Sequence, residues 1–199
     1  MNNQILTVLY KSKHASNAKL SYFQKVQGIW TNPIKNVDAI CGKNGFSNTK
    51  IEGDMTTPIG VFDIPFAFGT TDEKNLKIKY INVVNHVWVD DASSIYYNTI
   101  QEKNNNLLWY SSEQLNLPVY KYSLVVGYNT IKPKPNKGSA IFVHCKGTCP
   151  YTAGCIAIDE YVLKDIISLL NISEKPIIII DSLDNINKIK EKVGVIFEE

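Results

Sequence analysis

Short apolar stretches separated by turn residues run through the first half of the chain. Residues Gln4 to Leu9 alternate apolar and polar side chains, as a half-buried β-strand does. Two further stretches, Lys19 to Val26 and Ile29 to Trp30, flank a Gln27-Gly28 turn. Val37 to Cys41 then runs into a glycine-containing turn. This pattern predicts a meander of short strands and not a helical domain.

The pattern is least regular between residues 70 and 118, where aromatic side chains are spread among polar ones. They predict either an aromatic-lined groove or ordinary core packing. Tyr120 to Tyr128 alternates like a strand, and a proline-rich loop follows at Thr130 to Gly138. Two fully apolar runs come next, Ile141 to Val143 and Ile156 to Ile158, which are typical of buried strands.

The period of the pattern changes after Cys155. Apolar residues recur every three or four positions from Val162 to Leu170, which predicts an amphipathic helix that Asp159 can cap. A short buried strand is expected at Pro176 to Ile180, and a last helix and tail at Leu183 to Phe197. We therefore expect one mainly β domain over residues 1–199, with a core of about 5–181 and a C-terminal extension at 182–199.

The composition is that of an ordinary globular protein, with 44% hydrophobic and 20% charged residues. A net charge of +2 is too small to argue for nucleic acid as a partner. No apolar run approaches the ~18 residues of a transmembrane segment, and Met1 to Leu20 lacks the layout of a signal peptide. The sequence is thus expected to be intracellular or trimmed from a longer chain. It contains no arginine, so lysine, hydroxyl or backbone groups must meet any bound carboxylate.

A histidine and a cysteine mark the ends of the two buried runs. His144 follows the first run, Cys155 precedes the second, and a short loop joins them. A free cysteine, with a pKa of about 8.5, is only a few per cent thiolate at neutral pH, and a nearby histidine activates it. Gly154 permits unusual backbone angles, so neighbouring N–H groups can form an oxyanion hole. The spacing favours nucleophilic catalysis.

The same segment offers four soft metal ligands, namely His144, Cys145, Cys149 and Cys155. Structural zinc sites usually pair their ligands in knuckles, and neighbouring residues of a strand point to opposite faces, so zinc is the weaker interpretation. Cys145 is then a core residue, and Cys149 a loop thiol able to form a disulfide with Cys155. His86 could be a second base but fits no recognisable constellation, so a structural or surface role is favoured, and His14 in the basic N-terminal stretch carries no functional prediction.

These residues resemble the L,D-transpeptidase catalytic domain, also called the YkuD domain. Its signature is a histidine, a variable loop, and Ser/Thr-x-Gly-Cys before an apolar strand, which His144, Thr152, Gly154 and Cys155 match. Further similar stretches are Glu52-Gly53-Asp54 with Thr57-Pro58-x-Gly60-x-Phe62, Trp88 to Asp91 with Tyr96 to Asn98, and Val125 to Asn129 leading to Gly138 to His144. The resemblance covers most of residues 5–181 and implies a β-sandwich of mixed sheets, with one helix after the cysteine and a possible C-terminal helix.

The resemblance also implies a mechanism that needs no cofactor and no metal. Cys155 attacks the third residue of a peptidoglycan stem peptide and expels the terminal D-alanine. His144 keeps the sulfur anionic and then moves protons to and from the amines, oriented by a backbone carbonyl of Cys145 or its neighbours. The N–H groups of Gly154 and Cys155 hold the oxyanion. A second stem peptide as acceptor gives a 3→3 crosslink, and water gives L,D-carboxypeptidase activity.

Substrate contacts are expected from Tyr151, Thr152, Ala153, Tyr97 and Trp88. Many members have histidine where Ala153 stands and arginine or asparagine where Ala157 stands, and many have a longer loop before the cysteine, so substrate contacts should differ here. Carbapenem-type β-lactams are the expected covalent inhibitors, and the cell envelope or the exterior is the expected location. The alternatives are a cysteine peptidase that only hydrolyses and a non-catalytic cell-wall-binding module.

Overall fold

The main sheet has ten strands in a computed structural model that describes residues 2–103, 108–187 and 191. Three neighbouring pairs in it are parallel and the others are antiparallel, so the sheet is mixed. In spatial order the strands are β6 (Gly60–Asp63), β15 (Ile177–Ser182), β1 (Gln4–Tyr10), β2 (Asn17–Val26), β3 (Ile29–Ile40), β14 (Ile156–Ile158), β13 (Phe142–Cys145), β12 (Ser123–Val125), β7 (Ala67–Gly69) and β8 (Tyr80–Asn82). The mainly β prediction is confirmed.

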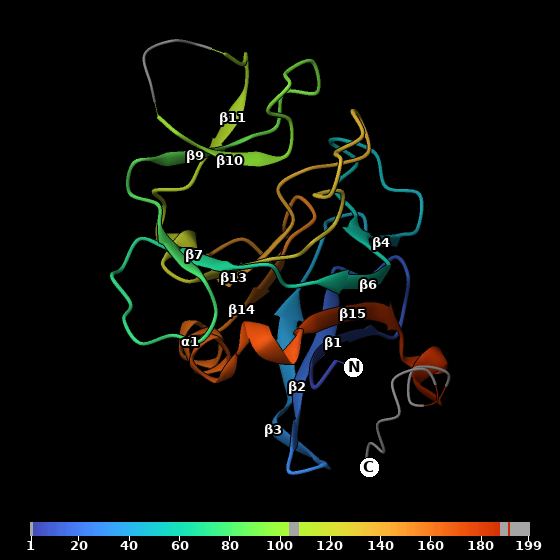
Figure 1. The fold of residues 1–199 in the computed structure, drawn as a ribbon. Helices are drawn as coiled ribbons and strands as arrows, with labels where there is room; N and C mark the ends of the chain where they lie inside the picture. Colours follow the sequence, from blue (N-terminus) through green and yellow to red (C-terminus); the bar gives the residue numbers. More distant parts are fainter. Residues whose placement is uncertain (1, 104–107, 188–190, 192–199) are drawn as a thin grey trace.

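The remaining elements are small. A three-stranded sheet of β9 (His86–Val89), β10 (Thr99–Glu102) and β11 (Ser112–Gln114) lies apart from the N-terminal strands (Figure 1). A parallel pair joins β4 (Phe46–Ser47) and β5 (Thr57–Pro58), and the helices are α1 (Glu160–Leu169) and the 3₁₀ turns η1 (Pro118–Tyr120), η2 (Ile172–Glu174) and η3 (Leu183–Asn185). Three strands of the irregular stretch thus form a separate small sheet, whereas β8, from the same stretch, belongs to the main sheet.

Strands β2 and β3 form a hairpin at the predicted turn. Gln27 and Gly28 both have positive φ angles, of 51° and 84°, which suits a tight hairpin. The two separate strands predicted on its far side are one strand, β3, because hydrogen bonds to β2 continue through its polar, partly exposed middle. The strand predicted at Tyr120 to Tyr128 is shorter than expected, since a proline begins the 3₁₀ turn η1 there.

The two ends of the main sheet come close together. Only residues 64–66 separate β6 from β7, although these strands lie near opposite ends of the sheet. The N–H of Gly127 donates to the carbonyl of Asp63 at 2.8 Å, and that of Val125 to the carbonyl of Phe66 at 3.0 Å. The sheet therefore folds into two facing layers around one core, which includes Leu6, Val8, Leu20, Leu124, Val143, Ile156, Ile158 and Ile178.

Helix α1 covers one end of this core. Its apolar face buries Val162, Leu163, Ile166 and Ile167, as the spacing predicts. Asp159 occupies the N-cap position but makes no capping hydrogen bond, because its carboxylate pairs with Lys146 at 3.1 Å. Of the predicted last helix, η3 is described, and residues 188–190 and 192–199 lie outside the described residues. No helix in the described part of the chain has the length and hydrophobicity to cross a membrane.

Candidate active site

Strands β13 and β14 place His144 and Cys155 on one face of the sheet. The strands are parallel, and His144 lies opposite Ala157. Alternate side chains of a strand share a face, so Cys155, two residues before Ala157, lies on the side of His144. The intervening side chains, Val143, Cys145, Ile156 and Ile158, belong to the main core. Cys145 is therefore a core residue, as predicted.

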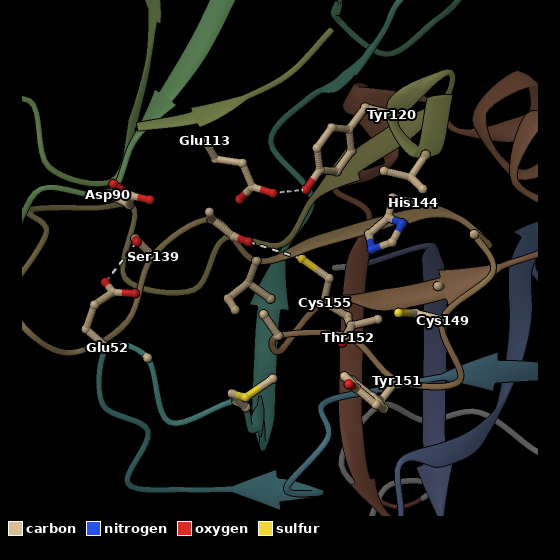
Figure 2. A pocket seen from close by; sticks show the side chains of 18 of the residues that line it. Glu52, Asp90, Glu113, Tyr120, Ser139, His144, Cys149, Tyr151, Thr152 and Cys155 are labelled. Atoms are coloured by element: carbon tan, nitrogen blue, oxygen red, sulfur yellow. Dashed lines mark hydrogen bonds between the residues drawn. The ribbon is translucent and has the colours of Figure 1, made fainter. Parts of the chain in front are cut away.

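A cavity of about 450 Å³ opens beside these two side chains. Figure 2 shows the sulfur of Cys155 and the ring of His144 pointing into it, with carboxylates on the opposite side. The polar residues that line the cavity are Lys50, Glu52, Asp90, Glu113, Tyr120, Ser139, His144, Thr148, Cys149, Tyr151, Thr152 and Cys155. Segments far apart in the sequence thus contribute to a single site.

Thr152 organises the turn that presents the cysteine. Its backbone N–H donates to the carbonyl of Cys41 at 2.9 Å, and its carbonyl accepts the N–H of Lys43 at 3.0 Å. Its Oγ1 donates to the carbonyl of Cys155 at 2.7 Å and accepts the N–H of Gly154 at 3.1 Å. The Gly154 N–H was expected to donate to the oxyanion. In this structure it donates its hydrogen bond to the hydroxyl of Thr152.

Gly154 fills a position that other residues cannot take. Its φ angle is 142°, and a Cβ there would lie 2.8 Å from the carbonyl oxygen of Thr56. Both the backbone conformation and the space require glycine. The Thr-x-Gly-Cys pattern is thus explained by a hydroxyl that closes the turn and a glycine that fits against the neighbouring loop.

The imidazole of His144 is oriented by the backbone. Its Nδ1 lies 2.8 Å from the carbonyl oxygen of Cys145. A carbonyl only accepts hydrogen bonds, so Nδ1 carries the proton and the Nε2 lone pair remains for the cavity. Burial lowers the pKa of His144, although the bond to Cys145 opposes this shift. The orienting carbonyl is that of Cys145, the first of the expected candidates.

The thiol of Cys155 is held between two backbone groups. Sγ donates to the carbonyl of Ala140 at 3.2 Å and accepts the N–H of Phe142 at 3.3 Å. Burial raises the pKa of Cys155, Glu113 raises it further, and Phe142 and Lys50 lower it. Together with the lowered pKa of His144, this favours a neutral thiol and imidazole at rest. The expectation that His144 keeps the sulfur of Cys155 anionic stays a prediction, and these pKa directions do not favour it.

The five expected substrate-binding residues fall into two groups. Tyr151, Thr152 and Ala153 line the cavity. Trp88 and Tyr97 are 2% and 3% exposed and do not belong to the lining. Trp88 packs on Phe142 with 4.9 Å between ring centroids, and Tyr97 donates its hydroxyl hydrogen to Glu52. These two would act on a substrate only through their neighbours, and all five roles stay predictions.

Several charged and aromatic residues of the cavity were missed from the sequence. The ring of Tyr120 packs against His144, and its hydroxyl donates to Glu113, whose pKa is raised by burial. Glu52 accepts hydrogen bonds from Tyr97 and, at 2.8 Å, from Ser139. Glu52 lies in a stretch that resembles the family, but nothing in the sequence singled out Tyr120 or Glu113. Their roles depend on contacts distant in sequence.

The four cysteines are free, so Cys149 and Cys155, which the sequence suggested are able to pair, form no disulfide in this structure. Cys149 is exposed and the other three are buried. Within residues 2–103, 108–187 and 191, no group of three or more histidine, cysteine or acidic side chains is arranged to hold a metal ion.

A comparison with protein-family models agrees with the sequence resemblance. The family model of the L,D-transpeptidase catalytic domain, YkuD, matches residues 14–179. The solved structure of the helical cell shape determining protein Pgp2 from Campylobacter jejuni matches with 13% identity and a TM-score of 0.47. That match covers 91% of this chain and 48% of that one, so the chain spans about half the length of that protein. No curated protein matches the chain.

Proposed function

The chain belongs to the L,D-transpeptidase catalytic domain family, and on this premise we propose that it transfers peptidoglycan stem peptides through a thioester on Cys155, forming 3→3 crosslinks. One observation carries the proposal. The hydrogen bond from Nδ1 of His144 to the Cys145 carbonyl leaves Nε2 as a base on the face of the sheet that carries Cys155. The site of action would be the cell envelope.

Acylation begins with a proton transfer. Nε2 of His144 takes the thiol proton as Sγ of Cys155 attacks the carbonyl carbon of the third stem residue. The S–C bond forms while the π electrons of the carbonyl move to its oxygen, which gives a tetrahedral oxyanion. The C–N bond then breaks, its electron pair leaves with the nitrogen of D-alanine, and this nitrogen takes the proton from Nε2.

Deacylation reverses these roles. The amine of a second stem peptide attacks the thioester carbonyl and gives its proton to Nε2 of His144. The C–S bond breaks, and Sγ of Cys155 regains the proton. The backbone N–H of Cys155 is the proposed donor to the oxyanion in both halves, and a donor of this kind contributes about 3 kcal/mol in other acyl-transfer enzymes. Water in place of the amine would release the tripeptide.

Intact mass tests the proposal. The protein and its Cys155→Ala variant would each be incubated with a stem tetrapeptide, and separately with a carbapenem. We expect an adduct on the parent that peptide mapping assigns to Cys155, no adduct on the variant, and a crosslinked dimer from the tetrapeptide. An equal adduct on the variant would contradict the assignment of Cys155 as the nucleophile. Formation of tripeptide without dimer would show an L,D-carboxypeptidase and not a transferase. If the parent protein formed neither adduct nor product, a non-catalytic wall-binding module would be favoured.

A further inference from the structure

A buried lysine reaches the catalytic cavity through a slot between two glycines. Lys50 is 4% exposed. Among the described residues that line the cavity, it is the one lysine. A Cβ at Gly138 would lie 2.8 Å from its Cε, and a Cβ at Gly154 would lie 3.2 Å from its Nζ. Both glycines have positive φ angles, of 95° and 142°. The fold therefore leaves space for this side chain where other residues would fill it.

Asp54 fixes the position of the ammonium group. Nζ of Lys50 lies 2.6 Å from Oδ1 of Asp54, and both side chains are largely buried. The carboxylate also accepts the N–H groups of Ile51 and Thr56, both at 2.9 Å, and the hydroxyl of Thr56 at 2.8 Å. These three bonds hold Asp54 and spread its charge. An ammonium carries three N–H donors, so the bond to Asp54 leaves two for other acceptors.

We propose that Lys50 is a further catalytic residue, whose ammonium stabilises the negative charge that develops at Cys155, first on sulfur and then on the oxyanion. The proposal rests on the proposed function. The hydroxyl of Thr152 occupies the N–H of Gly154, so the backbone lacks the second oxyanion donor that the sequence suggested. The ammonium lies beside this same glycine. Charged donors bind anions more strongly than neutral ones, so the ammonium of Lys50 can serve as the oxyanion donor in place of the Gly154 N–H.

Lys50 transfers no proton in this scheme. Its ammonium pairs with the carboxylate of Asp54, and His144 moves the protons. Its charge also opposes the effects of burial and of Glu113, which raise the pKa of Cys155. The competing explanation is that Lys50 only holds the loop of residues 51–56 in place, and the test below separates the two.

The first test measures Cys155 alone, without any stem peptide. Iodoacetamide alkylation would be followed across pH in a Cys149→Ser background, for Lys50→Met and for the control Lys19→Met. Lys19 forms an exposed pair with Asp38 at 2.7 Å and does not line the cavity. The charge of Lys50 lowers the pKa of Cys155, so we expect Lys50→Met to alkylate several-fold more slowly at a given pH. The control should match the parent.

The second test is acylation by the stem tetrapeptide. Loss of one oxyanion donor reduces the rate about 100-fold or more, and we expect this for Lys50→Met. Should the unpaired Asp54 prevent folding, the double variant Lys50→Met/Asp54→Asn removes both buried charges and is measured instead. A folded variant, by thermal unfolding, with the alkylation profile and acylation rate of the parent would overturn the proposal.

The two proposals fail in different ways. If alkylation depends on Lys50 but the parent does not turn over the tetrapeptide, the proposed function fails and the effect of Lys50 on Cys155 stands. If the parent turns over the tetrapeptide and the Lys50 variants do so equally fast, the proposed function stands and Lys50 has only a structural role.

Discussion

The ring of Tyr120 packs edge-on against the imidazole of His144, with 5.4 Å between their centroids. The ring of Phe142 lies against the same tyrosine ring, with 5.8 Å between centroids, so Tyr120 contacts both the histidine and the aromatic core. Its hydroxyl donates to Glu113, which lines the cavity. The imidazole of His144 thus has a backbone hydrogen bond to Cys145 and an edge contact with the ring of Tyr120, which Figure 2 shows beside it.

Two substitutions of Tyr120 separate its ring from its hydroxyl. Tyr120→Phe keeps the contact with His144 but removes the donor to Glu113, which should cost about 1 kcal/mol of unfolding free energy. Tyr120→Leu also removes the ring, which should cost about 2 kcal/mol or more and slow acylation at least tenfold. Chemical denaturation and the acylation rate measure both effects. Equal acylation rates in the two variants would mean that the ring does not position His144.

Acid should inactivate the enzyme only below the ordinary pKa of histidine. Burial lowers the pKa of His144 from 6.5, and the proposed mechanism needs the neutral imidazole. The acylation rate is therefore expected to hold at pH 6.5 and to fall as the pH passes through the lowered pKa. Rates measured from pH 4.5 to 8 would show this, and a midpoint above 6.5 would contradict it.

The same shift affects stability. His144 protonates more readily in the unfolded chain, so its contribution to folding is present above pH 6.5 and is lost as the pH falls through the lowered pKa. The unfolding free energy of His144→Gln should lack this pH-dependent contribution. Denaturation curves of both proteins at several pH values give the difference, and parallel pH dependences would argue against a lowered pKa.

Gly154→Ala should damage both stability and activity. The new Cβ would meet the carbonyl oxygen of Thr56 at 2.8 Å, in a backbone conformation that alanine rarely adopts. We expect a loss of about 1–3 kcal/mol of unfolding free energy and little adduct on Cys155. Gly28→Ala is the matched control, because Gly28 also has a positive φ angle, of 84°, but a Cβ added there would have no atom within 4 Å. A control that loses as much stability as Gly154→Ala would show that crowding at Thr56 is unimportant.

Thiol reagents should distinguish the four cysteines by exposure. Cys149 is exposed, whereas Cys41 and Cys145 lie in the main core. In the native protein, iodoacetamide at neutral pH should label Cys149 first, with Cys155 slower because burial raises its pKa. Peptide mapping over time gives the order. Early labelling of Cys41 or Cys145 would contradict the packing of the core.

Local patterns were enough to predict much of the fold. The Gln27-Gly28 hairpin, the buried strands beside His144 and Cys155, and the amphipathic face of α1 depend on neighbours along the chain. Local patterns were less informative where solvent or a distant partner decides the outcome. Strand β3 continues through polar residues because β2 supplies its hydrogen bonds, and Asp159 pairs with Lys146 in place of capping α1.

The sequence by itself determined which residues carry the candidate chemistry, because a histidine and a cysteine stand at the ends of two apolar runs that a short loop joins. The register that places His144 opposite Ala157, two residues after Cys155, came from the structure. Tertiary structure alone decided their surroundings. Burial raises the pKa of Cys155 and lowers that of His144, the hydroxyl of Thr152 accepts the hydrogen bond of the Gly154 N–H, and Nζ of Lys50 lies beside that glycine. Charge, burial and hydrogen bonding in the cavity depend on groups that are distant along the chain, which no local pattern encodes.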